Sequence, residues 1–203
     1  MVGWEKFNRI AYKMIEVIYI NVLWILFSAI GLGLFGIFPA TAAMFIVVRK
    51  LINNEESIKI FPAYWTSFRS NFLQANGFGM IFLLIAYFFY FDFYFLQLNS
   101  GKLEFLYPVL IFILISGIVT LLFFFPVYAH FDLKFFQYFK QSLFISITSP
   151  IEVIAIGASA AIIFFVTTIL PGIIPIFTGS VFAYAATFIS IRAFARIERR
   201  QSI

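Results

Sequence analysis

Residues 17–48 read VIYINVLWILFSAIGLGLFGIFPATAAMFIVV, and these 32 residues contain no charged side chain. At about 1.5 Å of rise per residue, a straight helix of this length outruns the hydrocarbon core of a bilayer, which is roughly 30 Å thick. The stretch must therefore turn back within itself. Glycines and a proline interrupt the apolar run in its middle, and the sequence predicts the turn near Gly36 to Pro39.

Four more apolar stretches follow, so the sequence predicts an all-α polytopic membrane bundle that forms one domain over residues 1–203. The six expected spans cover residues 17–37, 38–49, 74–97, 105–128, 151–170 and 173–193. Segment 38–49 is short for an untilted crossing, so a half-helix packed inside the bundle remains an alternative. Composition points the same way, because 63% of the residues are hydrophobic and 11% are charged, against about 25% charged in soluble domains.

The positive charges predict the orientation. Lys and Arg stay on the cytoplasmic side during insertion, and 13 of the 14 fall in alternate connecting segments, with Lys102 as the exception. Both termini are therefore expected inside. The net charge of +5 then reflects topology and attraction to anionic lipids rather than nucleic-acid binding.

Two predicted cytoplasmic segments have the pattern of amphipathic helices that lie in the membrane interface. The first is residues 1–16. The second lies within the loop at residues 50–73, where Phe61, Trp65, Phe68 and Phe72 form an apolar stripe with Arg69 on its flank. Such helices anchor a protein to the membrane, and an alternative is that they dock another subunit.

Polar residues inside the apolar stretches are candidates for function. Asp92 lies in the third expected span, where an ionisable side chain suggests proton or ion handling; the alternative is an ordinary carboxylate that reaches the interface. Tyr87, Tyr90, Tyr94 and Gln97 share one helix face, and Tyr87 should face protein or a wet cavity. Glu152 follows Pro150 and is interpreted as a helix cap.

Small residues four apart predict close helix approach, and the pairs are Gly157 with Ala161 and Gly179 with Ala183. Catalytic signals are weak. His130 and Asp132 do not have a recognised metal-ligand spacing, the chain has no Cys, and the common phosphate-loop, nucleophile-elbow and zinc-protease motifs do not occur. We therefore expect no enzyme activity, no metal and no cofactor.

Five segments together resemble the YesL-like bacterial integral membrane proteins: NVLW at 21–24, GIFPATAA at 36–43, VVRK at 47–50, FRSNFLQA at 68–75 and FPVYAHFD at 125–132. At position 130, where the family usually carries a cation, this chain has His130. Genes of the family commonly lie beside carbohydrate ABC importers. The resemblance therefore implies a multi-pass protein of the bacterial cytoplasmic membrane that contacts importer permeases.

The function expected on this basis is that of an accessory, non-ATPase, non-catalytic subunit of a carbohydrate ABC import system. Permease subunits and membrane lipids are the expected partners, and nucleic acid is not. One alternative is a small secondary transporter or channel with a path near Asp92 and Tyr87, and another is a structural or lipid-organising protein. The candidate functional or partner-binding residues are Asn21, Trp24, Pro39, Arg49, Trp65, Phe68, Arg69, Tyr87, Asp92, His130, Asp132, Gly157 and Gly179.

Overall fold

The computed structural model describes residues 2–53, 58–99 and 103–201. Within these residues the chain forms seven α-helices and two short 3-10 turns, and it contains no strand. The helices are α1 (Val2–Ile30), α2 (Leu34–Ile52), α3 (Ile60–Leu98), α4 (Tyr107–His130), α5 (Phe135–Thr148), α6 (Pro150–Ile169) and α7 (Ile174–Gln201). Six of them, all except α5, are long and apolar enough to cross a membrane. The predicted all-α membrane helical fold is confirmed.

The turn between α1 and α2 is tighter and earlier than predicted. Gly33 N–H bonds to the Ser28 carbonyl at 2.9 Å and Leu32 N–H to the Ala29 carbonyl at 3.0 Å, which is a Schellman ending for α1. Leu32 and Gly33 have positive φ angles of 61° and 71°. The reversal therefore occurs at residues 31–33, and the expected turn near Gly36 to Pro39 was placed too late.

The residues expected to turn instead lie in the first two turns of α2. Gly36 packs so closely against α1 that a Cβ there would collide with the backbone of Ser28, so this glycine lets two helices touch rather than reversing the chain. Pro39 is buried inside α2. With 19 residues, α2 is long enough for a crossing, whereas the expected segment 38–49 was only its second part.

Helix α3 is the longest element. Its 39 residues correspond to about 58 Å at 1.5 Å per residue, roughly twice the thickness of a hydrocarbon core. The amphipathic helix expected within the loop at residues 50–73 is, from Ile60 onward, continuous with the following span, and residues 54–57 of that loop lie outside the described residues. Residues 2–16 are likewise continuous with the rest of α1. Such a long helix must tilt strongly or project beyond the bilayer.

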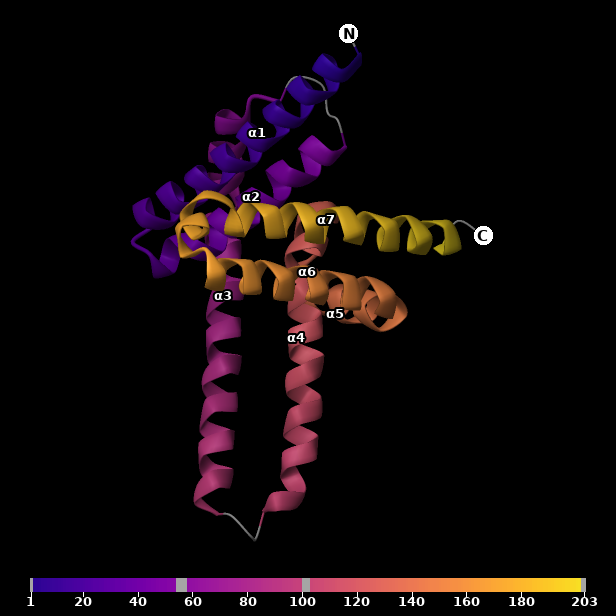
Figure 1. Ribbon diagram of the computed structural model, residues 1–203. Helices are drawn as coiled ribbons and strands as arrows, with labels where there is room; N and C mark the ends of the chain where they lie inside the picture. Colours follow the sequence, from indigo (N-terminus) through magenta and orange to yellow (C-terminus); the bar gives the residue numbers. More distant parts are fainter. Residues whose placement is uncertain (1, 54–57, 100–102, 202–203) are drawn as a thin grey trace.

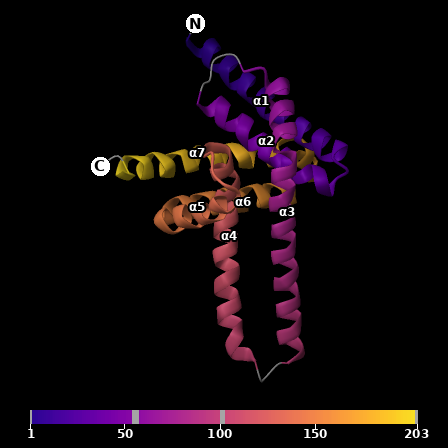
Figure 2. The ribbon, with the colours of Figure 1, turned by 180° about the vertical axis from the view of Figure 1, so that it is seen from behind.

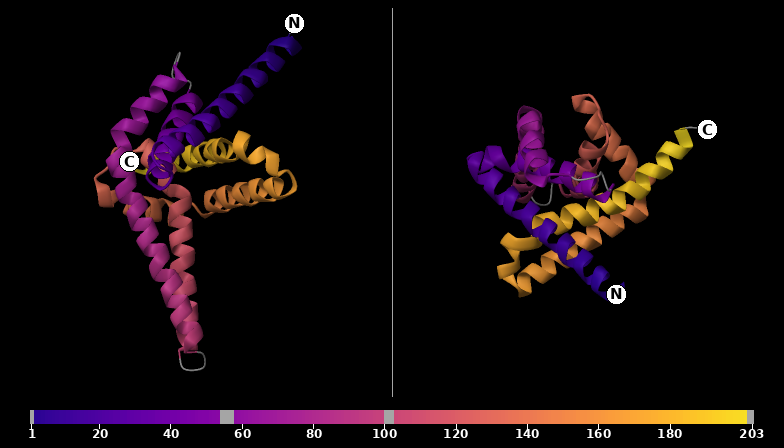
Figure 3. Two further views of the ribbon diagram at one scale, coloured as in Figure 1. Left: turned by 90° about the vertical axis from the view of Figure 1, so that its left-hand side faces the viewer. Right: turned by 90° about the horizontal axis from the view of Figure 1, so that it is seen from above.

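The helices form three splayed hairpins rather than a parallel bundle (Figure 1). The outer halves of α3 and α4 extend away from the rest of the molecule, and the same arrangement is seen from behind in Figure 2. Helices α6 and α7 run side by side and lie crosswise to that hairpin, as the side and top views also show (Figure 3). Helix α2 is central, because it packs against α1, α3, α4 and α7.

Aromatic rings fill the junction where α3, α4 and α5 meet. Phe78 of α3 stacks on Phe135 with ring centroids 4.1 Å apart, and it makes edge-on contacts with Phe124 and Phe139. Offset and edge-on ring pairs of this kind stabilise packing beyond the burial of their area. The root of the α3–α4 hairpin is therefore firmly packed, in contrast to its outer half.

Candidate functional site

The segments NVLW and GIFPATAA, the first two that carry the family resemblance, meet at the contact between α1 and α2. The indole N–H of Trp24 donates to Oγ1 of Thr41 at 3.0 Å, and this hydroxyl in turn donates to the Ile37 carbonyl at 2.7 Å. In a membrane interior each of these polar groups needs a partner, because lipid offers none. Trp24 and the segment GIFPATAA are thus partners of each other.

Asn21, fully buried on α1, reaches the last helix. Its Oδ1 accepts a hydrogen bond of 3.0 Å from the backbone N–H of Ser180 on α7. A Cβ added at Gly179 would lie 3.1 Å from that same oxygen. Gly179 therefore permits a close contact within the chain, and Asn21 fixes the position of α7 on α1.

Helix α3 is attached to its neighbours by two tyrosine hydroxyls. The buried Tyr64 donates to the Ala40 carbonyl of α2 at 2.7 Å. Tyr128 of α4 donates to Oδ1 of Asn71 at 2.6 Å, and Oε1 of Gln74 lies 3.1 Å from the same hydroxyl. The segments FRSNFLQA and FPVYAHFD, far apart in the sequence, are therefore in direct contact.

Arg49 and His130 come together where α2, α4 and α7 meet. The Arg49 guanidinium donates to the backbone carbonyl of His130 at 3.3 Å, and the His130 ring lies 4.6 Å from the ring of Phe194, centroid to centroid. Helix α4 ends at His130. The positive charge of Arg49 therefore lies near the last carbonyls of α4, where the helix dipole makes a cation favourable. Asp132, just beyond, is exposed.

One ion pair links the last two helices. The Arg196 guanidinium lies 2.6 Å from Oε1 of Glu152, whose side chain is 8% exposed while that of Arg196 is 50% exposed. The other carboxylate oxygen of Glu152, Oε2, is buried without a hydrogen-bond partner in the described part of the chain. Glu152 does lie in the first turn of α6, as its interpretation as a cap required, but its partner is a side chain of α7.

A central cavity of about 390 Å³ lies between α1, α2, α3, α4 and α7. Trp24 and Thr41 contribute its polar groups, and most of the remaining wall is aromatic or aliphatic, including Phe45, Phe82 and Phe125. Among the described residues, no group of three or more His, Cys, Asp or Glu side chains is placed to hold a metal ion. The cavity suits an apolar occupant.

In the outer half of the α3–α4 hairpin most side chains are exposed, although Leu96 is buried and the ring of Phe93 lies beside that of Tyr107. Tyr87 and Tyr90 are 62% and 71% exposed, and Asp92 is half-buried. None of these three side chains has a hydrogen-bond or ion-pair partner within the described residues. Tyr87 was expected to face protein or a wet cavity, and within the described residues its side chain is not covered by another helix. Neither it nor Asp92 lines the central cavity.

Some of the remaining candidate residues are buried in contacts within the chain, and others are exposed. Phe68 is buried against Phe27, with ring centroids 5.0 Å apart. Trp65 is 43% exposed beside the same ring, and Arg69 is exposed. A Cβ added at Gly157 would meet open space. Of the two small-residue stripes, the one at Gly179 is used within the chain and the one at Gly157 is available.

Comparison with known proteins places the chain in a family. The family described as "Protein of unknown function, DUF624" matches residues 17–93. The chain is 33% identical to the uncharacterized protein YteU of Bacillus subtilis (strain 168) over 183 residues, which cover 89% of this chain and 82% of YteU. It is 32% identical to the uncharacterized protein YesL of the same organism over 203 residues, covering 96% and 92% of the two chains. The chain belongs to the YesL-like DUF624 family.

The resemblance inferred from the five segments is thus confirmed. A further relative in this family, the uncharacterized protein YesV of Bacillus subtilis (strain 168), is 27% identical over 188 residues, which cover 91% of this chain and 89% of YesV. No solved structure matches the chain. The DUF624 match, residues 17–93, contains α2 and most of the residues that attach α1, α2 and α3 to one another.

Sequence reasoning did not single out several residues that connect these segments. Thr41, Tyr64, Asn71, Gln74 and Tyr128 carry the interhelical hydrogen bonds described above. Four of the five stand inside the quoted segments, so a signal was present. A polar side chain in an apolar span must find a partner, and pairing such residues across spans would have suggested these contacts.

Proposed function

We propose that this protein is an accessory, non-catalytic subunit of a membrane complex, and that its partner binds the outer half of the α3–α4 hairpin. The observation that carries the proposal is the set of polar groups exposed there, namely the hydroxyls of Tyr87 and Tyr90 and the carboxylate of Asp92. Tyr87 lies eleven residues before the end of α3 at Leu98, which is about 16 Å at 1.5 Å per residue. With Leu98 at the membrane surface, a hydroxyl about 16 Å deep has no water to bond, so a partner protein would supply its hydrogen bond.

The packing of the hairpin supports the same proposal. At Gly117, halfway along α4, a Cβ would meet no atom within 4 Å, so the two helices do not pack closely on each other there. Large apolar side chains cover the outer surface, including Phe88, Phe91 and Phe112. An isolated hairpin gains little from its own contacts, and helix association in lipid depends on close packing and interhelical hydrogen bonds. A partner helix would provide both.

The partner we propose is the permease of a carbohydrate ABC importer, a class of partner that comes from the family resemblance. We also propose that the protein lies in the bacterial cytoplasmic membrane with both termini inside. The alternate placement of Lys and Arg supports this orientation, and Arg49 and Lys50 in the last turn of α2 agree with it. The ends of α2 and α4 that meet at Arg49 and His130 would then lie on the cytoplasmic side.

Co-purification from cells that express a sugar importer tests the proposal. The combined variant Tyr87→Phe, Tyr90→Phe, Asp92→Asn removes the polar groups of the hairpin and leaves its apolar shape. We expect it to lose the permeases that the unchanged protein retains in mild detergent, while it remains monodisperse. The matched control is Tyr12→Phe, Tyr19→Phe, Asp132→Asn, which changes three exposed residues of the same types elsewhere. Equal recovery of permeases with both variants would contradict the proposed surface.

A further inference from the structure

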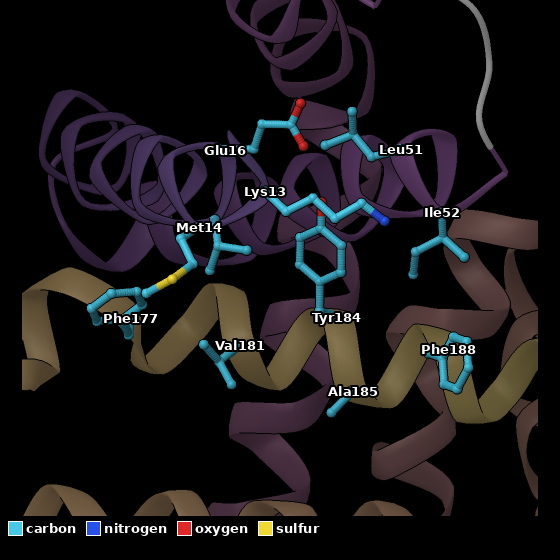
Figure 4. A pocket seen from close by; sticks show the side chains of 11 residues that line it. Lys13, Met14, Glu16, Leu51, Ile52, Phe177, Val181, Tyr184, Ala185 and Phe188 are labelled. Atoms are coloured by element: carbon cyan, nitrogen blue, oxygen red, sulfur yellow. The ribbon is translucent and has the colours of Figure 1, made fainter. Parts of the chain in front are cut away.

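A groove of about 720 Å³ lies between α1, α2 and α7, and the proposed function does not use it. Its walls are mainly apolar and include Met14, Leu51, Ile52 and Val181. Figure 4 shows the groove from close by, with the side chains of α7 along one side and those of α1 along the other. A hollow of this size on the lipid-facing surface must be filled in the membrane.

The groove is short compared with a transmembrane helix. Its α7 wall extends from Phe177 to Phe188, a separation of eleven residues or about 16 Å along the axis of α7. Such a length fits the acyl chains of a single lipid that lies along α7. A helix of about 20 residues, roughly 30 Å long, would extend beyond it.

Opposite Tyr184, between its Phe177 and Phe188 ends, the groove carries unpaired charges of both signs. Lys13 and Glu16 both line the groove, and neither has a hydrogen-bond or ion-pair partner among the described residues. In Figure 4 the ammonium end of Lys13 extends toward Ile52. Arg192 adds a second cation at the Phe188 end of the groove, because its guanidinium carbon lies 5.0 Å from the ring centre of Phe188.

A phospholipid with a phosphate and a primary ammonium complements this arrangement. Lys13 and Arg192 provide positive charge for the phosphate, and Glu16 can accept hydrogen bonds from the ammonium. The hydroxyl of Tyr184, which also lines the groove, is available to donate to a phosphate or ester oxygen. A lipid with a phosphate and an uncharged headgroup would leave Glu16 without a partner.

We infer that the groove between α1 and α7 is a binding site for one phospholipid of the phosphatidylethanolamine type. Its acyl chains lie along α7 toward Phe177, and its headgroup lies between Lys13 and Glu16. No residue of α3 or α4 lines this groove. An experiment that disproves lipid binding here would therefore leave the proposed partner surface on the hairpin untouched, and the reverse also holds.

Native mass spectrometry of the full-length protein, taken from nanodiscs with equal amounts of phosphatidylethanolamine, phosphatidylglycerol and phosphatidylcholine, tests the inference. We expect one retained lipid, with phosphatidylethanolamine preferred. Lys13→Gln should lower retention of all three lipids by about fivefold, the effect expected of one basic residue near a membrane surface. Glu16→Gln should remove the preference for phosphatidylethanolamine over phosphatidylglycerol and leave total retention almost unchanged.

Val181→Trp fills the groove and should abolish retention without changing the headgroup contacts. Ile154→Trp, at an exposed position on α6, is the matched control and should retain the lipid. Lys140→Gln, also exposed and outside the groove, controls for the loss of one positive charge. If Val181→Trp does not fold, Lys13→Gln and Glu16→Gln still test the site, because both residues line the groove. Equal retention of the three lipids by the unchanged protein, or a dimer that carries no lipid, would overturn the inference.

Discussion

The hydroxyl of Tyr128 lies 2.6 Å from Oδ1 of Asn71 and donates a hydrogen bond that joins α4 to α3 across 57 residues of sequence. Asn71 is itself held by a bond of 2.8 Å from its Nδ2 to the Ser67 carbonyl. This contact lies beside the aromatic cluster around Phe78, whose ring centroid is 5.7 Å from that of Tyr128. The inner root of the hairpin is thus fixed by a hydrogen bond and by close ring packing, whereas in the outer half the rings of Phe93 and Tyr107 lie 6.4 Å apart, centroid to centroid.

Tyr128→Phe should destabilise the protein without changing its fold. The change removes one hydrogen bond and leaves the amide oxygens of Asn71 and Gln74 without this donor, at a cost of about 1–2 kcal/mol. A lower midpoint of thermal unfolding in detergent, followed by fluorescence or light scattering, would show the loss.

Tyr90→Phe provides the control for this measurement, since it removes the same hydroxyl from a ring that is 71% exposed and has no hydrogen-bond partner in the described chain. Its unfolding midpoint should equal that of the unchanged protein. If the two phenylalanine variants lose stability equally, the Tyr128 contact does not have the role assigned to it.

Gly179→Leu and Gly157→Leu should separate packing within the chain from an available surface. At Gly179 even a Cβ would lie 3.1 Å from Oδ1 of Asn21, so a leucine must displace α7 from α1 and break the bond to Ser180. At Gly157 the added side chain meets open space. Size-exclusion chromatography in detergent should show aggregation or low yield for Gly179→Leu and a monodisperse peak for Gly157→Leu. A well-folded Gly179→Leu protein would contradict the α1–α7 contact.

The Glu152–Arg196 pair should respond asymmetrically to neutralisation. Arg196→Gln leaves a buried carboxylate without its cation and should cost about 2–3 kcal/mol, whereas Glu152→Gln leaves a half-exposed guanidinium that water can solvate and should cost less than about 1 kcal/mol. The double variant should recover most of the loss caused by Arg196→Gln. Unfolding midpoints of the three variants measure this, and equal, additive effects would mean that the two residues do not interact.

The fold class could be predicted from the sequence because apolar length and the placement of charges carry that information directly. The exact position of the first turn and the role of each glycine were harder to predict from the sequence. The glycines and the proline between residues 31 and 39 all signalled a turn, but only Leu32 and Gly33 adopt positive φ. Gly36 instead serves the close contact with Ser28. A glycine that reverses the chain and a glycine that admits a neighbouring helix look the same in a single sequence.

The candidate site was predictable where a residue had a local signal and not where its role depends on a distant partner. Asn21 and Trp24 were singled out because the segment NVLW resembles the family, and both make hydrogen bonds between helices. Their partners were not singled out, because Asn21 bonds to the backbone N–H of Ser180, a group that nearly every residue has, and hydroxyls such as that of Thr41 are common in spans. Gly157 and Gly179 have the same spacing pattern, and only the three-dimensional packing separates them.

The orientation can be measured directly, since the chain has no native cysteine. Single cysteines at Asn53 and Asp132, both exposed, should resist a membrane-impermeant thiol reagent in intact cells and react after the membrane is opened. A cysteine at Gly172, in the exposed turn before α7, should react in intact cells. Reaction at Asn53 in intact cells would contradict an even number of crossings and the proposed position of the termini.

Photo-crosslinking in living cells directly tests whether the α3–α4 hairpin contacts an importer permease. A photoreactive phenylalanine analogue at Tyr90, on the hairpin, is compared with the same analogue at Phe164, which is 74% exposed on α6 and so similarly accessible. In cells that express the sugar importer, we expect a crosslinked product at position 90 that contains an importer permease, and no such product at position 164. If position 90 yields only lipid adducts or crosslinks to a second copy of this chain, the hairpin does not bind an importer and the account of the protein as an accessory subunit is wrong.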